Sequence, residues 1–374
     1  MKTCDFLVVG GGIAGASLAY ELAASGKVIL LEREDRPGYH ATGRSAAQFI
    51  ETYGNETVRA LTRASRAFYE APPEGFAAQP LLNRRPVLFI AREDQSAALA
   101  AYVEEVKPQA PEIEELTGAE VERLVPVLKP GYAAAGVLEP ESSDIDTDAL
   151  HQGYLSGFRR RGGEIALKAE VTALARSDGA WRVDAGAETY EAAVLVNAAG
   201  AWGDALATLA GVTPVGLVPK RRTIVTFDPP AGTDPTAWPL VGDVEEQFYF
   251  KPDAGRILAS PADETPSPPC DAQPEELDIA IVMDRLQTAT TLAPRRLAHS
   301  WAGLRSFVAD KSLVIGADNA VEGFFWLVGQ GGYGFQTAPA AARAAAGLLL
   351  EGALPDDIAA EGLNAADLAP ARLR

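Results

Sequence analysis

Two glycine-rich stretches near opposite ends of the chain have residue types and spacing that suit a nucleotide cofactor. The first, Gly10–Gly15 (GGGIAG), fits the pattern GxGxxG. In this pattern Gly10 permits a tight turn, Gly12 lets a pyrophosphate approach the backbone, and Gly15 lets a helix pack closely on a strand. Glu32 ends a second apolar run, about 20 residues later, where a carboxylate accepts a hydrogen bond from a ribose hydroxyl. The stretch therefore predicts a dinucleotide site.

The second stretch, Gly329–Pro339 (GQGGYGFQTAP), leads into an alanine-rich helix. A protein that binds NAD does not need a late glycine cluster, whereas a flavin ring needs a backbone cradle, so the stretch favours FAD. We expect the N–H groups from Gly331 to Phe335, and the dipole of the helix from about Thr337, to face the flavin. There they would stabilise the negative charge of the reduced ring.

A third segment, Thr42–Ala47 (TGRSAA), follows the second predicted strand and is expected to lie along the pyrophosphate. Arg44 would offset phosphate charge and Ser45 would form a hydrogen bond; a solvated surface loop is the alternative. No metal-binding or Ser-His-Asp pattern includes the histidines, which are His40, His151 and His299.

Composition disfavours several classes of function. The net charge is −18, from 33 basic and 51 acidic residues, whereas nucleic acids and anionic membranes need basic patches. The two cysteines, Cys4 and Cys270, form neither a disulfide framework nor a metal-binding spacing. The chain opens on a strand pattern without a signal peptide, and it has no apolar run long enough to span a membrane. We therefore expect a cytoplasmic protein.

The elements around these stretches predict an α/β fold. Asp5–Gly10, Ile13–Ser25 and Lys27–Glu32 read as strand, helix and strand, the start of a Rossmann-type unit. Later strands are expected at Arg85–Ala91, Glu170–Arg176, Trp181–Ala185, Glu188–Tyr190, Val194–Gly200, Arg221–Phe227, Gln247–Lys251, Arg256–Ala259, Ser312–Gly316 and Phe324–Val328. Further helices are expected at Thr57–Glu70, Asp94–Lys107, Ala119–Leu124, after Asp146 or Thr147, at Leu277–Leu292 and at Thr337–Glu351.

The alternation of helix and strand patterns predicts two interleaved domains. The FAD-binding domain is expected at residues 1–50, 142–214 and 298–374. The substrate-binding domain, a mixed sheet with helices, is expected at residues 51–141 and 215–297.

Seven separated segments resemble the D-amino-acid oxidase/dehydrogenase (DAO) superfamily of FAD enzymes. They extend to about residue 350 and are GGGIAGASLAYEL, LERE, GYHATGRSAA, DIDTDALHQGY, VLVNAAGAW, WAGLRSFVAD and EGFFWLVGQGGYGFQT. The likeness is strongest to bacterial FAD-dependent D-arginine dehydrogenases, through PGYHATGRSAA, KRR at 220–222 and FYFKPDAG at 248–255. The resemblance implies hydride transfer from substrate Cα to flavin N5, giving an imino acid that hydrolyses to a 2-oxo acid and ammonia.

The cofactor is expected to be non-covalent FAD, because GRSAAQ offers no cysteine or histidine near the ring. The stretches and the resemblance together assign these residues to it: Gly10, Gly12, Ile13, Ala14, Gly15, Glu32, Arg33, Thr42, Arg44, Ser45, Ala46, Ala47, Val171, Ala199, Gly200, Gly303, Gly331, Gly332, Tyr333, Gly334, Phe335, Gln336 and Thr337.

An amino-acid substrate brings a carboxylate, for which a bidentate arginine is the matching partner. Arg222 and Arg305 match the arginines that bind it in the similar dehydrogenases, while Arg221 should face away because neighbours on a strand alternate. Tyr53 and Tyr249 match pocket tyrosines, and the carbonyl of Gly332 is a candidate acceptor for the amine. A buried structural ion pair is the alternative for each arginine.

The side-chain pocket departs from the D-arginine pattern. Val87 stands where that pattern has Glu, Gln48 where it has His, and Ile50 where it has a small polar residue. A guanidinium would lose its ion pair there, so we expect a neutral, apolar D-amino acid. Arg84 and Arg85 lie close in sequence and keep an acidic side chain open.

Two other functions remain open from the sequence. One is oxidation of sarcosine-like secondary amines or cyclic imino acids, which the same arginines would serve. The other is a flavoprotein without turnover, against which the retained site residues argue. The electron acceptor is unidentified, with a quinone or another electron carrier as candidates.

Overall fold

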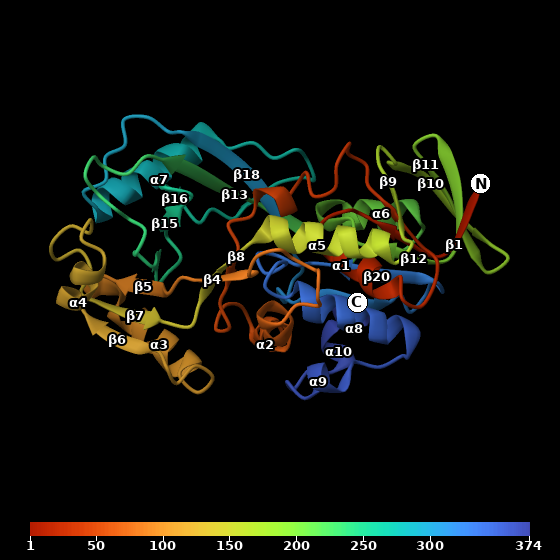
Figure 1. Cartoon of the computed structure of the whole chain (residues 1–374), viewed down its shortest axis with the longest axis horizontal. Coiled ribbons are helices and arrows are strands. Elements are labelled where there is room, and N and C mark those ends of the chain that lie inside the picture. Colours follow the sequence, from red (N-terminus) through yellow and green to blue (C-terminus); the bar gives the residue numbers. More distant parts are fainter.

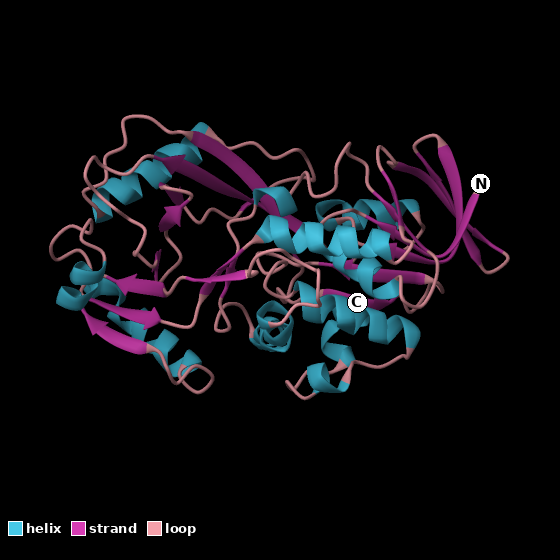
Figure 2. Ribbon diagram, viewed as in Figure 1, coloured by secondary structure: helices cyan, strands magenta, loops and turns pink.

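The computed structural model describes residues 1–374 and is elongated, with strands gathered toward both ends (Figure 1). Helices flank the strands at each end (Figure 2). The strands form three sheets, of eight, nine and three strands.

The eight-stranded sheet contains the predicted Rossmann-type unit. Its strands are β1 (Lys2–Val9), β2 (Val28–Leu31), β9 (Glu164–Ala166), β10 (Val171–Ser177), β11 (Ala180–Ala185), β12 (Glu188–Asn197), β19 (Val314–Ala317) and β20 (Phe324–Val328). β1 pairs in parallel with β2 and β12, and β12 with β20. All four residues of β2 are buried, as expected of a parallel strand covered on both faces.

The two short strands expected at Glu188–Tyr190 and Val194–Gly200 are one strand, β12. Its first residues pair with β11 and its last with β20, so the same strand has a different neighbour along each half. The polar beginning and the apolar end of β12 reflect these different surroundings, which is why they read as separate strands.

The nine-stranded sheet is antiparallel except where β5 meets β14. Its strands are β5 (Val87–Ala91), β6 (Glu114–Thr117), β7 (Ala135–Glu139), β13 (Val218–Phe227), β14 (Leu240–Asp243), β15 (Tyr249–Asp253), β16 (Arg256–Ser260), β17 (Thr265–Pro266) and β18 (His299–Phe307). β18 pairs with β13 along its whole length. It therefore belongs to this sheet although it lies in the segment 298–374, and the domain boundaries stay a prediction.

A three-stranded sheet lies at the passages between the larger sheets, and comprises β3 (Gln48–Phe49), β4 (Leu82–Arg84) and β8 (Ser143–Ile145). The helices are α1 (Ile13–Leu22), α2 (Glu56–Glu70), α3 (Ser96–Val106), α4 (Gly118–Leu124), α5 (Thr147–Arg160), α6 (Gly203–Leu209), α7 (Glu276–Ala289), α8 (Ala338–Leu350), α9 (Asp356–Ala359) and α10 (Ala365–Leu368).

The core lies on both faces of the eight-stranded sheet. Phe6 and Val8 of β1 join the larger apolar cluster, which includes α1, α5 and α8, whereas Leu7 and Val9 join the cluster beside α6. Asp146 caps α5 by accepting a hydrogen bond from the amide of Ala149, as predicted. A third cluster fills the space between the nine-stranded sheet, α4 and α7. The predicted α/β fold class is confirmed.

Candidate active site

The first glycine loop joins β1 to α1 through close backbone contacts. Gly10 has a φ of +113°, a conformation that favours glycine, and a Cβ there would collide with the carbonyl oxygen of Ala198. A Cβ at Gly15 would collide with the carbonyl oxygen of Gly10. Gly15 therefore has the packing role that GxGxxG predicts.

Two buried side chains hold this loop. Glu32 accepts hydrogen bonds from the amides of Gly11 at 3.0 Å and Glu34 at 2.9 Å. His151, from α5, lies with Nε2 2.9 Å from the carbonyl oxygen of Gly11. Since a carbonyl only accepts, this nitrogen donates. Burial lowers the pKa of His151, and the hydrogen bond to Gly11 offsets this only in part.

The start of α1 presents free donors. The amide of Ile13 donates to Oγ1 of Thr42 at 3.0 Å, whereas the amides of Gly12 and Ala14 donate to no acceptor in the protein. Unpaired N–H groups at a helix N-terminus form an anion site. This end of the site therefore suits the pyrophosphate of a dinucleotide.

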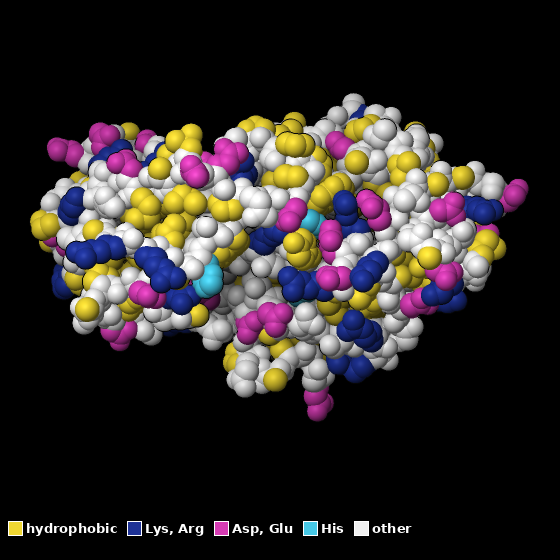
Figure 3. All heavy atoms as spheres, turned by 90° about the horizontal axis from the view of Figure 1, so that it is seen from above, with side chains coloured by type: hydrophobic (Ala, Val, Ile, Leu, Met, Phe, Trp, Pro, Cys, Tyr) yellow, Lys and Arg dark blue, Asp and Glu magenta, His cyan; other side chains and the backbone are white.

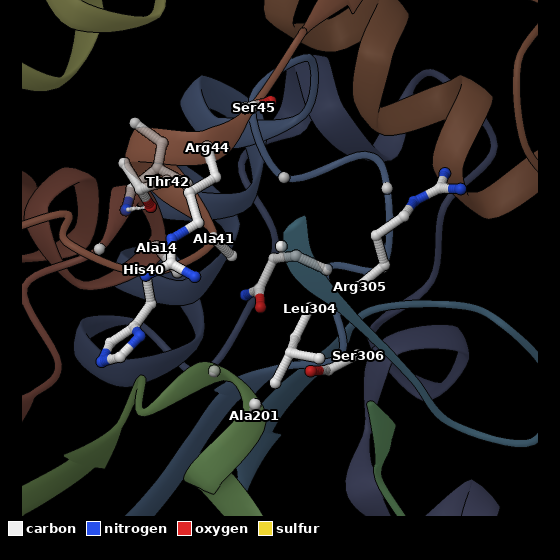
Figure 4. A pocket seen from close by; sticks show the side chains of 18 of the residues that line it. Ala14, His40, Ala41, Thr42, Arg44, Ser45, Ala201, Leu304, Arg305 and Ser306 are labelled. Carbon is white, nitrogen blue, oxygen red and sulfur yellow. Dashed lines mark hydrogen bonds between the residues drawn. The ribbon is translucent and has the colours of Figure 1, made fainter. Parts of the chain in front are cut away.

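One cavity of about 500 Å³ extends from the first glycine loop to the second. In Figure 4, Thr42, Arg44 and His40 lie on one side and Arg305 extends away on the other. The expected residues that line this cavity are Gly10, Gly12, Ile13, Ala14, Glu32, Arg33, Thr42, Arg44, Ser45, Ala46, Ala47, Gln48, Ile50, Tyr53, Val171, Ala199, Gly200, Arg222, Tyr249, Gly303, Arg305, Gly331, Gly332, Gly334, Phe335 and Gln336.

Four expected residues do not line the cavity: Gly15, Val87, Tyr333 and Thr337. Val87 is fully buried behind the wall that Ile50 forms. Tyr333 packs edge-on against Tyr53, and Thr337 is fully buried with its hydroxyl donating to the carbonyl of Tyr333.

The second glycine loop offers another set of free donors. Gly331 has a φ of +51°, and its amide donates to Ser306 at 2.9 Å, while that of Tyr333 donates to Gln330 at 2.8 Å. The amides that donate to no acceptor in the protein are those of Gly332, Gly334, Phe335 and Gln336. They directly precede α8, whose dipole adds partial positive charge. Both ends of the cavity thus have the donors that FAD needs.

Arg44 has protein partners that the sequence did not indicate. Its Nη1 donates to the carbonyls of Ala272 at 2.7 Å and Ala302 at 3.0 Å, and its Nη2 pairs with Asp271. The guanidinium therefore links residues 261–274 to Thr42–Ala47, the segment expected to lie along the pyrophosphate. A contact between Arg44 and phosphate stays a prediction.

Arg222 and Arg305 come together from the paired strands β13 and β18. Arg305 donates through Nη2 to the hydroxyl of Tyr53 at 2.8 Å, and Arg222 donates through Nε to the carbonyl of Asp263 at 2.9 Å. Nη1 of Arg305 and Nη2 of Arg222 are buried without a hydrogen-bond partner. Arg221 faces the other way, where it pairs with acids of α7, as alternation predicted.

Glu264 lies beside this arginine pair. Its Oε1 is 3.6 Å from Nη2 of Arg222 and 3.7 Å from Nη1 of Arg305, and its Oε2 accepts from Lys220 at 2.7 Å. Burial would raise the pKa of Glu264, but Lys220, Arg305 and Arg222 together hold it below its usual value. Three cations and one anion leave a net charge of +2, which favours an anionic ligand.

Apolar side chains form a separate wall of the cavity. Ile50, Val87 and Leu240 form one cluster, against which Phe89 and Tyr249 pack. Neither Arg84 nor Arg85 lines the cavity, because Arg84 pairs with Glu141 and Arg85 with Asp144. The open possibility of an acidic substrate side chain therefore gains no support.

The sequence analysis missed Leu240, Phe89 and Glu264. Leu240 and Val241 form a short apolar run between Pro239 and Gly242, which is a weak strand signal. Glu264 lies in a loop rich in proline and acid, where no periodicity marks a position near the arginines.

The surface does not suggest a large charged ligand. On the face in Figure 3, basic and acidic side chains are interspersed. No group of three His, Cys, Asp or Glu side chains is arranged to bind a metal ion. None of the helices has the length and hydropathy required to cross a bilayer.

Comparison with known proteins places these features in a family. The family described as FAD dependent oxidoreductase (DAO) matches residues 5–348. The uncharacterized oxidoreductase YurR of Bacillus subtilis is 24% identical over 356 residues, covering 90% of this chain and 92% of YurR.

Two solved structures share the fold. L-α-glycerophosphate oxidase from Mycoplasma pneumoniae, with FAD bound, has a TM-score of 0.83 and 21% identity, covering 93% of this chain and 95% of that one. Glycine oxidase from Geobacillus kaustophilus has a TM-score of 0.81 and 19% identity, covering 94% and 95%.

Proposed function

Because the chain belongs to the DAO family of FAD-dependent oxidoreductases, we propose that it is a D-amino-acid dehydrogenase that acts on neutral, apolar substrates. The reaction is oxidative deamination. A hydride leaves Cα, a proton leaves the amine, and the imino acid reacts with water to give a 2-oxo acid and ammonia. FAD, bound non-covalently, supplies the two-electron acceptor. The D configuration rests on the likeness to D-arginine dehydrogenases.

The observation that carries this proposal is a pair of buried nitrogens, one each on Arg222 and Arg305, that have no hydrogen-bond partner and approach Glu264 only to 3.6 and 3.7 Å. Buried donors without partners cost free energy, about 1–3 kcal/mol each. One carboxylate with two oxygens would satisfy both and reduce the net positive charge. Tyr53 fixes Arg305 through its hydroxyl and contacts the substrate, with Tyr249 close to Arg222 on the same wall.

The contact between Gly332 and Arg305 supports a role for the Gly332 carbonyl in orienting the amine. A Cβ at Gly332 would occupy the position of the Arg305 guanidinium, so the backbone of Gly332 lies directly against the carboxylate anchor. An amine bonded to the same Cα as the carboxylate lies one bond further on, within reach of the Gly332 carbonyl. No side-chain base is needed when the amine loses its proton to water.

The apolar wall supports a neutral side chain. A guanidinium or ammonium directed at Ile50, Leu240 and buried Val87 would meet apolar side chains. The carboxylates of Asp243 and Glu246 also line the cavity, but they belong to the end of β14 and the turn after it, not to this cluster. Leaving such a charge unpaired costs about 3–5 kcal/mol. Apolar side chains gain about 25 cal/mol for each Å² they bury in the same place.

A panel of D- and L-amino acids tests the proposal. The bound flavin should lose its absorbance anaerobically with D-amino acids whose side chains are neutral and largely apolar, and this class should show a higher kcat/KM than charged D-amino acids. If D-Arg or D-Lys were best, the substrate class would be wrong. Reduction by sarcosine or proline alone would support the secondary-amine function, and reduction by none would support a flavoprotein without turnover. An artificial acceptor and O2 assayed in parallel separate dehydrogenase from oxidase.

A further inference from the structure

Gln48, which lines the cavity from β3, has an amide whose orientation is fixed by a buried ionic group. Its Nε2 lies 2.8 Å from Oδ1 of Asp144, its partner on β8. Asp144 also pairs with Lys251 and Arg85. Burial would raise the pKa of Asp144, but these two cations hold it below its usual value, so the carboxyl is ionised.

An ionised carboxylate only accepts hydrogen bonds. The NH2 group of Gln48 must therefore face Asp144, and the carbonyl oxygen must point elsewhere. This removes the usual ambiguity between amide oxygen and nitrogen. Oε1 of Gln48 is buried and has no hydrogen-bond partner, and the residue as a whole is 8% exposed.

The surroundings of Gln48 are otherwise apolar on the cavity side. Gln48 and Ile50 both line the cavity whereas Phe49 does not, and Ile50 belongs to the cluster with Val87 and Leu240. Gln48 thus contributes an acceptor beside an apolar wall. A buried carbonyl without a partner is costly, and a donor from a ligand would relieve that cost.

Charge selects the kind of donor. Asp144, Lys251 and Arg85 sum to +1, so the group next to Gln48 disfavours a cationic side chain. The carboxylates of Asp243 and Glu246, which line the same cavity, belong to the β14 segment and not to β3, where Gln48 lies. The donor that fits is neutral.

We propose that Gln48 determines specificity by accepting a hydrogen bond from a neutral donor on the substrate side chain. The substrate class is then D-amino acids whose largely apolar side chain carries a hydroxyl, a phenol or an indole N–H. This inference rests on the proposed function and narrows its substrate class.

Matched substrate pairs test it. D-Tyr against D-Phe and D-Thr against D-Val differ in the donor with little change of shape. Stopped-flow reduction of the bound flavin gives the Kd and the rate for each. In the native protein the donor-bearing member should have a kcat/KM about 3–10 times higher, the range that one neutral hydrogen bond provides.

Two variants distinguish the effect of the Gln48 acceptor from the effect of the apolar wall. Gln48→Met keeps the length and removes both amide groups, while Lys251 and Arg85 still satisfy Asp144. It should abolish or reverse the preference within each pair. Ile50→Val trims the wall without touching the hydrogen bond, and should leave the ratios unchanged while changing both members together.

The outcomes are distinct. A native protein that prefers the apolar member of both pairs, or equal ratios in the native protein and Gln48→Met, overturns the role of Gln48 but leaves D-amino-acid oxidation standing. The native ratios decide this even if Gln48→Met fails to fold. Failure of every amino acid to reduce the flavin overturns both the proposed function and this inference.

Discussion

At the scale of single residues, Arg305 carries the largest expected effect. Arg305→Met removes the guanidinium that Tyr53 orients and leaves a substrate carboxylate with Arg222 as its one remaining arginine partner. Losing one partner of such a pair costs about 2–5 kcal/mol, so kcat/KM should fall by about 30-fold to several-thousand-fold. The visible spectrum should still show bound FAD.

Arg221→Met is the matched control for Arg305→Met, because Arg221 lies in the same pair of strands but pairs with Glu275 and Asp278. It should lower stability and leave kcat/KM near the native value. An unchanged kcat/KM in Arg305→Met would remove Arg305 from the substrate site.

Glu264 should have the opposite effect on ligand affinity. Its carboxylate faces the two nitrogens that a substrate carboxylate would use. Glu264→Gln removes this competing charge, so the Kd for a probe carboxylate such as benzoate should fall about 3–10-fold at low salt, within the range of partly buried charge interactions. Perturbation of the flavin spectrum during titration measures it.

Glu276→Gln controls for the change in net charge, since Glu276 is exposed at the start of α7. Its Kd for benzoate should equal that of the native protein. Weaker binding in Glu264→Gln would mean that Glu264 mainly holds the arginines in place.

The sequence predicted Arg222 and Arg305 because each lies in a segment that resembles a known family, and it predicted Tyr53 because this residue matches a pocket tyrosine of that family. It could not identify Glu264 or the free Oε1 of Gln48. Their roles depend on which atoms of distant segments meet, and local pattern does not encode that.

At the scale of elements, α5 supports the first glycine loop through the hydrogen bond between His151 and Gly11. Burial lowers the pKa of His151 from its model-peptide value of 6.5. The unfolded chain therefore binds the proton more tightly than the folded one. The stability contributed by neutral His151 is present above about pH 6.5 and is lost as the pH falls toward the lower folded value.

His151→Gln should flatten this dependence, because a glutamine amide can donate to Gly11 without titrating. Urea unfolding at about pH 5.5 and about pH 7.5 measures the difference. His299→Gln, at an exposed position, should show the same change in the free energy of unfolding between the two pH values as the native protein. If the free energy of unfolding changed equally with pH in all three proteins, the role of His151 would be contradicted.

Most elements could be predicted. Amphipathic or apolar periodicity placed α2, α5, α7 and α8 to within a few residues. Strands β14 and β18 were missed, because short or mixed runs become strands only when a partner strand covers them. Tertiary pairing therefore decided the elements that build the substrate pocket.

At the scale of the whole molecule, the chain runs from the eight-stranded sheet to the nine-stranded sheet and back twice, ending on the first. Neither sheet is continuous in sequence. Calorimetry should therefore show one unfolding transition for the holoprotein. Free FAD at about 100 times its Kd should add about 2.7 kcal/mol to the free energy of unfolding.

Removing FAD should lower the Tm of that single transition without splitting it. Two separate transitions in the holoprotein would show that the sheets unfold independently, despite the interleaved chain. The sequence predicted this interleaving from the alternation of helix and strand patterns, and it assigned all of residues 298–374 to the FAD-binding domain.

Strand β18 holds two cavity-lining residues at a fixed separation. Gly303 and Arg305 both line the cavity, and two residues along a strand span about 7 Å on one face. Gly303 lies beside Arg44, and Arg305 is the proposed anchor of the substrate carboxylate. In the proposed function one strand would therefore set the depth at which a substrate meets the flavin, whereas β3, β5 and β14 would shape the side-chain pocket. Substitutions in β3, β5 and β14 could therefore change the substrate preference without changing the distance between the substrate and the flavin.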